Sequence, residues 1–418
     1  MQPKFINEIY KMKNGVFLSR TESSALRGIA ILGIILHNYC HFLGFAVKEN
    51  EYKFDPSRPM QFLDKFFSFD SDLFIHFFSF LGHYGVPIFL FISGYGLVKK
   101  YEAQPQPKGG AHPQPLPKGG EILHTIPEQS SPTRCLSLFT LHFIKKHFLK
   151  LFRLMVIGYL VFIGIYLLRH SDGAQVYSWD RVLAQLTMTI NFFYFDPDHI
   201  IKPGPYWYFG LMLQLYILYI LVIHRWRSNW LLAALAIGSV ALECCFVDSP
   251  DWLNYIRYNF IGALLPFCMG IWIAREEEPL SNSRPPSCSP SGAPILRFFT
   301  LHSSLFTLVI SALFVLFGSL SFWTWLFVPV FVVTGAIATV KLVSRLCISL
   351  PSGGLGVGSW FGSISAMLFV MHPIARELII SHYRRIDIYG GIFIYLLSSV
   401  ALAMLLKWIL QFIPNPKS

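Results

Sequence analysis

The stretch LRGIAILGIILHNYCHFL, residues 26–43, decides the fold of this chain because it is an apolar helix long enough to cross a bilayer. It carries Arg27 at its start, His37 near its middle and His41 one helical turn further on. Ionisable groups are expensive in hydrocarbon, and those that occur there are usually functional or paired. The stretch therefore predicts a membrane helix whose polar residues have a role inside the protein.

The composition of the whole chain supports a membrane protein. Of its 418 residues, 54% are hydrophobic and only 14% are charged, whereas a soluble domain is about 25% charged. The net charge of +11 fits basic cytoplasmic loops rather than a nucleic-acid partner. No small-residue cleavage pattern follows the first apolar run, so we expect no cleaved signal peptide. The cysteines are scattered without the spacing of a metal site or a disulfide framework, and we expect no metal.

Long apolar runs predict about ten membrane spans. They are 26–45, 80–98, 145–168, 205–223, 229–246, 256–274, 299–319, 322–341, 360–380 and 389–412. The basic clusters between them fall on one side, which places both termini in the cytoplasm. The run 183–195 is too short and polar to span, and we interpret it as an interfacial or re-entrant helix on the far side. Arg384 and Arg385 would then face outward, where they could contact an anionic substrate or lipid.

Two segments rich in proline and glycine interrupt the apolar pattern. Residues 102–134 contain an imperfect duplication of PQP…KGG, and residues 276–294 are similar in composition. Such segments cannot bury enough apolar surface to pack, so we expect disordered cytoplasmic loops. The predicted fold is a single all-α polytopic membrane domain over residues 1–418, a bundle of about ten transmembrane helices with cytoplasmic N- and C-termini.

Basic residues gather where two helices enter the membrane from the cytoplasm. Taken by itself, Arg27 is interpreted as a membrane anchor whose side chain extends to the interface. Lys146, Lys150 and Arg153 recur at helical spacing in FIKKHFLKLFRLMVIGYL, residues 143–160. This face is either a collar for anionic lipids or a site for the phosphates of a cytoplasmic ligand, and the residues alone leave both readings open.

Two histidines lie near the middle of the membrane on different helices. His37 is about 15 Å along the helix from Arg27, and His372 is followed by Pro373, which opens the backbone beside it. Imidazole is well suited to move a proton near neutral pH, although a satisfied hydrogen bond between helices is the plainer reading. Two such histidines with a basic collar suggest a catalytic or proton-relay cavity.

Two further stretches carry weaker signals. In YGVPIFLFISGYGLVKK, residues 84–100, Pro87 predicts a broken helix and Ser93-Gly94 permits close approach of a neighbouring helix or ligand. In KPGPYWYFGLMLQLYILY, residues 202–219, aromatic residues cluster at the outer end of a span. An interfacial aromatic belt explains that cluster, and stacking against a sugar would use the same residues.

Three stretches, taken in order, resemble motifs of the membrane acyltransferase 3 family. ALRGIAILGIILHNYCHF resembles its first helix, YGVPIFLFISGYGL its Gly-Val-x-x-Phe-Phe-x-x-Ser-Gly element, and GSISAMLFVMHPI its late Ser-x-x-x-Tyr-Leu-x-His-x-Pro-Ile element. PYWYFGLMLQLY and LLPFCMGIWIAR support the match, which covers most of residues 20–410. The resemblance implies a ten-helix bundle that transfers acyl groups, most often acetyl from acetyl-CoA, to hydroxyls of cell-surface glycans or glycolipids.

The same resemblance implies a multi-pass protein of the bacterial inner membrane. Its expected partners are the lipid bilayer and the glycan or glycolipid acceptor. A separate periplasmic protein is a further possible partner, and no nucleic-acid partner is expected. Acetyl-CoA, or another acyl-CoA, is the expected donor.

The resemblance also assigns roles to individual residues. The family's first helix has an arginine, ten residues and then an essential histidine; here Asn38 stands at that position and His37 comes one residue earlier. We assign catalysis to His37, with His41 as the alternative active-site histidine, and to His372 and Arg27. We expect the donor to lie near Arg27, Lys146, Lys150, Arg153 and Ser93, and the acceptor near Trp207, Tyr208 and His41.

Two other classes of protein fit the same residues. A membrane transporter or exporter would use the buried histidines as a proton relay, and dependence on an acyl-CoA thioester would distinguish the enzyme from it. A non-catalytic subunit of a glycan assembly complex would tolerate loss of both His37 and His372.

Overall fold

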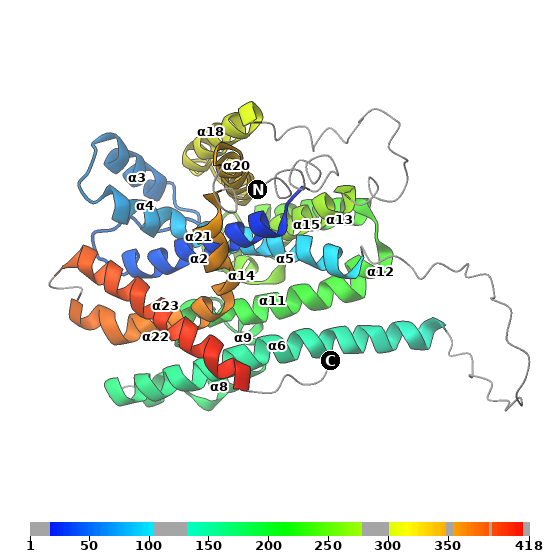
Figure 1. Cartoon of the computed structure of the whole chain (residues 1–418), viewed down its shortest axis with the longest axis horizontal. Coiled ribbons are helices and arrows are strands. Elements are labelled where there is room, and N and C mark those ends of the chain that lie inside the picture. Colours follow the sequence, from blue (N-terminus) through cyan, green and yellow to red (C-terminus); the bar gives the residue numbers. More distant parts are fainter. Residues whose placement is uncertain are drawn as a thin grey trace, which may run out of the picture.

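The computed structural model describes residues 17–102, 132–171, 173–277, 301–347, 354–383 and 387–412. Within these ranges every regular element is a helix and no strand occurs, which confirms the predicted all-α class (Figure 1). The predicted loops 102–134 and 276–294 lie almost entirely outside the described residues, as do Arg384 and Arg385.

The helices follow the chain from α2 to α23. Up to the end of α11 they are α2 (Arg20–Cys40), α3 (Ser57–Phe67), α4 (Leu73–Leu81), η1 (Gly82–Tyr84), α5 (Gly85–Tyr101), α6 (Pro132–Arg169), α7 (Gly173–Val176), α8 (Trp179–Leu186), α9 (Ile190–Phe193), α10 (Pro197–Ile200), η2 (Gly204–Tyr206) and α11 (Trp207–Leu218). The others are the π-helical η3 (Tyr219–Ile223), α12 (His224–Trp226), α13 (Asn229–Cys244), α14 (Pro250–Tyr258), α15 (Phe260–Glu277), α18 (Leu301–Gly318), α19 (Phe322–Trp325), α20 (Val328–Leu346), α21 (Gly356–Ser363), α22 (Ser365–Tyr383) and α23 (Ile388–Phe412).

Several helices are long and apolar enough to cross a membrane. In the described part of the chain five segments qualify, or up to seven if the bent pairs α14–α15 and α21–α22 each form one span. The helices α13 and α18 are apolar but shorter, and Arg27, His37 and Asn38 lower the mean hydropathy of α2. The structure thus supports a multi-pass membrane protein, while the count of about ten spans and the sides of the termini stay predictions.

The segment 183–195, interpreted from sequence as one helix at the interface, forms two short ones. The helix α8 ends at Leu186 and α9 begins at Ile190. Between them Met188 adopts a left-handed backbone with φ of 58°, which interrupts the helix. In agreement with the sequence, neither helix is a candidate span.

The helix α2 occupies the centre of the molecule. It packs against α4, η1, α5, α20, α21, α22 and α23 (Figure 1). Its start is fixed by a capping box, in which Ser19 accepts a hydrogen bond from the backbone N–H of Glu22 and Glu22 accepts one from that of Ser19. Because α2 touches elements from both halves of the chain, its polar residues meet groups that are distant in sequence.

The break in the second span lies before Pro87 rather than at it. The segment Leu73–Tyr101 consists of α4, the 3₁₀ turn η1 and α5, which begins at Gly85. Pro87 therefore falls in the first turn of α5, where a backbone N–H has no partner within the helix and its loss is harmless. The prediction that Pro87 itself breaks the helix is corrected in this way.

The glycine of the Ser93-Gly94 pair allows α5 and α15 to cross closely, as predicted. A Cβ atom at Gly94 would collide with the backbone oxygen of Phe267, and one at Gly270 would collide with the backbone oxygen of Phe91. Small residues at such crossings let two backbones approach, which is the usual way that helices associate inside membranes.

Candidate functional site

A cavity of about 190 Å³ lies between α2, α5, α6, α11 and α22. Its polar lining comes from Arg27 of α2, Ser93 of α5, and His147 and Lys150 of α6. The rest of the lining is apolar or aromatic and includes Val86, Phe89, Leu154, Tyr208, Phe209, Met212, Tyr216 and Phe369. The cavity therefore combines a cationic region with an apolar interior, although its elements are spread from residue 20 to residue 383.

Neither cation of the cavity has an acidic partner. No carboxylate forms an ion pair with Arg27 or Lys150 among the described residues. The tyrosine hydroxyl of Tyr101 lies 2.9 Å from Nε2 of His147, which orients that ring beside the two cations. Arg27 is partly buried without such a partner, which is costly for a positive charge, and the exposed Lys150 lines the same cavity. This region is therefore suited to an anionic ligand.

Three other cations at the same end of the molecule have acidic partners. Arg275 donates two hydrogen bonds to Glu102, at 2.9 and 3.1 Å. Lys341 lies 3.0 Å from Glu22, and Lys99 lies 3.2 Å from Glu277. These ion pairs join different helices and satisfy their own charges, which distinguishes them from the cations of the cavity.

At its other end the cavity stops one helical turn before three histidines. Ile34 lines the cavity and His37 follows it on α2; Phe369 lines it and His372 follows on α22. On α5, Val86 lines the cavity, and His83 lies one turn before it in η1. The rings of Phe369 and His372 are 5.8 Å apart.

The hydrogen bond of His37 determines which of its nitrogens carries the proton. Its Nδ1 lies 3.0 Å from the backbone oxygen of Ser79. Because a carbonyl oxygen can only accept, Nδ1 must be the donor, and in the neutral ring Nε2 keeps a free lone pair. His37 is buried, so the structure holds a neutral imidazole with a nitrogen that can accept a proton.

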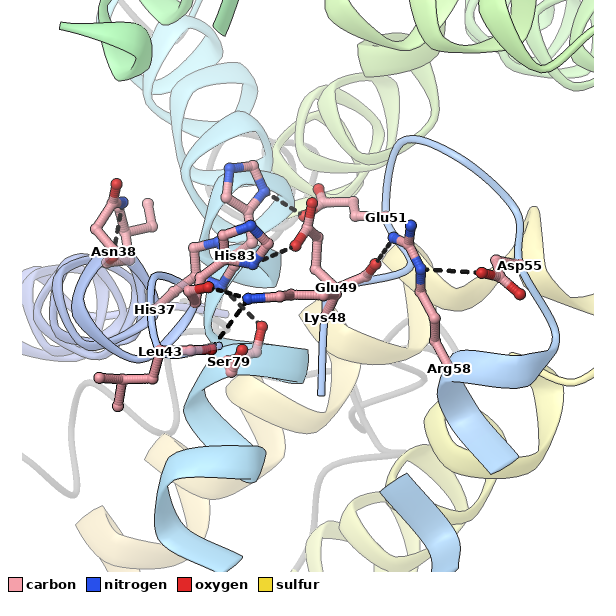
Figure 2. A network of polar contacts seen from close by, with 12 residues as sticks. His37, Asn38, Leu43, Lys48, Glu49, Glu51, Asp55, Arg58, Ser79 and His83 are labelled. Carbon is pink, nitrogen blue, oxygen red and sulfur yellow. Dashed lines mark hydrogen bonds and ion pairs between the residues drawn. The ribbon is translucent and has the colours of Figure 1, made fainter. Parts of the chain in front are cut away.

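His37 belongs to a cluster of three histidines and two glutamates, shown in Figure 2. The ring centre of His37 is 4.9 Å from those of His41 and His83. Nδ1 of His41 lies 2.6 Å from Oε2 of Glu49, and Nδ1 of His83 lies 2.7 Å from Oε2 of Glu51. Two histidines of the cluster thus have a carboxylate beside Nδ1, and His37 has a carbonyl there.

The two glutamates have different electrostatic environments. Burial would raise the pKa of Glu49, but contact with His41 and the nearby histidine rings hold it well below its usual range. Burial does raise the pKa of Glu51, against the opposing effects of His83 and Arg257. Arg257 itself is paired with Glu243 at 2.8 Å and donates to the backbone oxygen of Glu51.

His372 occupies a separate position in α22. Its Nδ1 lies 3.1 Å from the backbone oxygen of Leu368, so Nδ1 donates there, and in the neutral ring Nε2 is unprotonated. That Nε2 is buried and has no hydrogen-bond partner. One turn further on, Arg376 donates to the side-chain oxygen of Asn38 at 2.8 Å, which ties α22 to α2.

The structure therefore unites some of the predicted site residues and separates others. Four of them line the cavity: Arg27, Ser93, Lys150 and Tyr208. His37 and His41 lie together in the histidine cluster, while His372 stands apart from it. Three others do not line the cavity: Lys146 is exposed, Arg153 donates to the backbone oxygen of Leu410, and Trp207 is buried.

Trp207 is packed against the histidine cluster through other aromatic rings. Its ring centre is 5.6 Å from that of Tyr52 and 4.8 Å from that of Tyr258. Tyr52 also stacks on Tyr258 at 4.3 Å and contacts His83 at 5.2 Å. The predicted aromatic cluster thus meets the histidines through Tyr52, a residue of the loop after α2.

Several residues of the site were not singled out from sequence. His147 and Tyr216 line the cavity, and His83, Glu49 and Glu51 complete the histidine cluster. The spacing of His147 with Lys150, Leu151 and Leu154 on one helical face was a usable signal. For Glu49 and Glu51, the only sequence signal was their position just after the first apolar helix.

An all-helical, multi-pass membrane protein with a cation-lined cavity beside buried histidines is the class that this geometry defines. A protein-family model described as an acyltransferase domain matches residues 21–410, nearly the whole chain. The chain therefore belongs to the membrane acyltransferase 3 family. No curated protein and no solved structure matches it.

Proposed function

We propose that this membrane acyltransferase moves an acyl group, most simply acetyl, from acyl-CoA at the cytoplasmic side to a hydroxyl of a cell-surface glycan or glycolipid in the bacterial inner membrane. The observation that carries the proposal is the cavity, because its two cations lack acidic partners while its interior is apolar. Phosphates would satisfy Arg27 and Lys150, and an acyl chain would suit the aromatic lining.

The size of the cavity fits part of a donor rather than all of it. Ligand pockets for drug-sized molecules usually have volumes of roughly 300–1,000 Å³, whereas this cavity has about 190 Å³. We infer that it takes the acyl end and its thioester arm, while the nucleotide end stays at the mouth near Lys150, whose side chain is exposed. The donor supplies an activated thioester.

The chain's own residues would hold the reactants and move the proton. Arg27 and Lys150 bind the phosphates, and Ser93 lies where its hydroxyl can donate to a carbonyl oxygen in the cavity. Nε2 of His37 takes the proton from the acceptor hydroxyl as its oxygen bonds to the acyl carbon. The carbon–sulfur bond breaks, and the leaving thiolate takes this proton from Nε2 of His37, so the thiol departs and the base is restored. His372 offers a second unprotonated nitrogen on the opposite helix.

A pair of lysines on one helix tests donor binding. Membranes that contain each variant are incubated with labelled acetyl-CoA, and label released by mild base from glycan is counted over a range of donor concentrations. Lys150→Ala should raise the donor concentration needed for half-maximal transfer about tenfold, since a charge-assisted hydrogen bond is worth roughly 1.5–3 kcal/mol.

Lys146→Ala is the matched control, because Lys146 lies one turn away on α6, is exposed and does not line the cavity. It should behave like the unaltered chain. Equal transfer by all three proteins at every donor concentration would contradict this site, and transfer without any acyl-CoA would favour a different donor.

A further inference from the structure

Beside the cavity lies a set of metal-ligand groups that the proposed reaction uses only in part. We propose that His37, His41 and Glu49 bind one divalent transition-metal ion, with Zn²⁺ as the best fit. Each of the three residues offers one ligand atom, and these atoms all lie within 4.8 Å of one another. Sequence spacing gave no sign of such a site, since Glu49 belongs to a loop that folds back over the end of α2 (Figure 2).

The first ligand is already held as a metal-binding histidine would be. Histidine ligands almost always donate their second ring N–H to a carbonyl or carboxylate, which fixes the tautomer and the ring orientation. Nδ1 of His37 makes such a bond to the backbone oxygen of Ser79 at 3.0 Å. In the neutral ring Nε2 is then unprotonated, so its lone pair can bind a metal. The ring is buried, and the hydrogen bond to Ser79 fixes its orientation.

The second and third ligands face each other without a proper hydrogen bond. Nδ1 of His41 and Oε2 of Glu49 are 2.6 Å apart. Both atoms are buried, yet neither makes a hydrogen bond of acceptable geometry. Because Zn–N and Zn–O distances are about 2.0–2.2 Å, a small shift of either side chain would let both atoms bind one ion from the same side.

The charges and the donor set favour a borderline-soft metal. Glu49 brings a carboxylate oxygen to within 2.6 Å of Nδ1 of His41, beside the ring of His37. Two imidazoles and one carboxylate are a ligand set of catalytic zinc sites, in which a further position stays open. Mg²⁺ and Ca²⁺ prefer all-oxygen sites and fit less well.

The loop that supplies Glu49 is tied down on both sides of it. Lys48 donates to the backbone oxygens of His41 and Leu43, the latter at 3.1 Å. Arg58 donates to the backbone oxygen of Glu49 and is itself paired with Asp55 at 3.2 Å (Figure 2). These bonds hold the carboxylate next to α2, which reduces the entropy lost when a metal binds.

A bound metal would act on the proposed reaction through His37. Its Nε2 is the only nitrogen of that ring free to take a proton, and it is also the nitrogen that would bind the metal. This consequence rests on the proposed function: Zn²⁺ should slow acyl transfer by competing for the base. Binding itself does not depend on the reaction and is measured separately.

The binding experiment uses the full chain, purified in detergent, in competition with a chromophoric zinc chelator. The unaltered protein should take up one equivalent of Zn²⁺, and Glu49→Gln should weaken binding more than tenfold because a charged ligand is lost. Co²⁺ replaces Zn²⁺ in a second measurement, where its visible d–d absorption should appear with the unaltered protein and vanish with Glu49→Gln.

A second histidine–carboxylate pair provides the matched control. Nε2 of His170 lies 2.7 Å from Glu377, but this pair belongs to no group of three metal ligands among the described residues. His170→Gln should leave zinc binding unchanged. Should Glu49→Gln fail to fold, as judged by gel filtration, His41→Gln takes its place with the same expected loss.

The results separate the metal site from the acyl transfer. Zinc binding that is equally tight in the unaltered chain and in the folded Glu49→Gln or His41→Gln variant would overturn the site, as would a complete lack of binding. Tight binding of Zn²⁺ with no slowing of transfer would keep the site and overturn its action on His37.

Discussion

His37 and Asn38 are neighbours on α2 and have different partners, and Asn38 stands where the family pattern has a histidine. The family places its histidine eleven residues after the arginine, where this chain has Asn38. In the structure Asn38 faces α22 and binds Arg376, while His37 faces η1 and the other histidines. At 100° per residue the two neighbours must point to different sides of the helix. His37, not Asn38, is therefore in position to move a proton within the cluster.

The base assignment predicts a large loss of transfer when His37 is replaced. His37→Gln keeps a polar side chain at that position but removes the proton acceptor, and general-base help is worth about 10²–10⁴-fold in rate. Transfer of label from acetyl-CoA should fall by at least about 10²-fold. His170→Gln, which alters a histidine far from the cavity, should transfer at the normal rate. A His37→Gln variant with normal transfer would show that another group accepts the proton.

The link between Asn38 and Arg376 predicts an effect on stability. Asn38→Ala leaves the guanidinium of Arg376 without its 2.8 Å partner at the junction of α2 and α22. Loss of a hydrogen bond to a charged group should lower the free energy of unfolding by about 1.5–3 kcal/mol. Thermal unfolding in detergent measures this change. Asn38→Asp, which preserves an acceptor oxygen, should unfold near the normal temperature, and an equal loss in both variants would contradict the role of this bond.

Whole helices were predictable from the sequence where the apolar pattern was continuous. In the described part of the chain, each of the ten apolar runs overlaps one helix or two to three consecutive helices. The bends themselves were not predictable, because α14 and α15 meet at Asn259 and α21 and α22 meet at Ile364, neither of which is a proline or a glycine. Tertiary contacts decide such breaks: Asn259, for example, is bonded to Gln214 and to the backbone of Asn191.

The site was predictable only in part for a similar reason. Arg27, Ser93, Lys150 and Tyr208 could be found because they lie on apolar helices or beside them, where polar groups are conspicuous. Glu49, Glu51 and Tyr52 lie in a polar loop, where such residues are ordinary. Only the packing of that loop against α2 and η1 gives them a place in the histidine cluster.

The crossing of α5 and α15 predicts which glycine tolerates a methyl group. At Gly94 an added Cβ would overlap the backbone oxygen of Phe267, whereas at Gly96, on the same helix, it would meet nothing within 4 Å. Gly94→Ala should destabilise the protein by about 1–3 kcal/mol through overpacking. Gly96→Ala should be neutral or stabilise it by up to about 1 kcal/mol. Thermal unfolding of the pair measures the difference, and similar values would show that the helices separate easily.

Across the whole molecule, buried ion pairs form at both ends of the bundle. Glu22, Glu102 and Glu277 bind cations at the end that carries Arg27, and Glu51 and Glu243 bind cationic or imidazole partners at the end that carries His37. Most of these pairs join segments that are far apart in the sequence, whereas Glu243 and Arg257 are 14 residues apart. Arg27 and Lys150 line the cavity, and neither forms an ion pair with a carboxylate in the described part of the chain.

This arrangement predicts how stability depends on pH. Burial would raise the pKa of Glu102, but hydrogen bonds from His224, Arg275 and Tyr219 lower it from its usual value of 4.5 to about 2. A carboxylate whose pKa is lower in the folded state stabilises that state above the unfolded pKa, and this contribution disappears as the pH falls through the folded pKa. The unfolding temperature in detergent should therefore fall between about pH 4.5 and pH 2.

Glu102→Gln should lower the unfolding temperature at pH 7, because Arg275 loses its charged partner, and should flatten the decline on the acid side. The exposed Glu276 on the same end offers the control: Glu276→Gln removes a carboxylate that only accepts from Asn229 at 3.1 Å and should preserve the decline. If Glu102→Gln and the unaltered chain lost stability in parallel from pH 7 to pH 2, the ion pair at Glu102 would not be what holds α5 to α15 and η3.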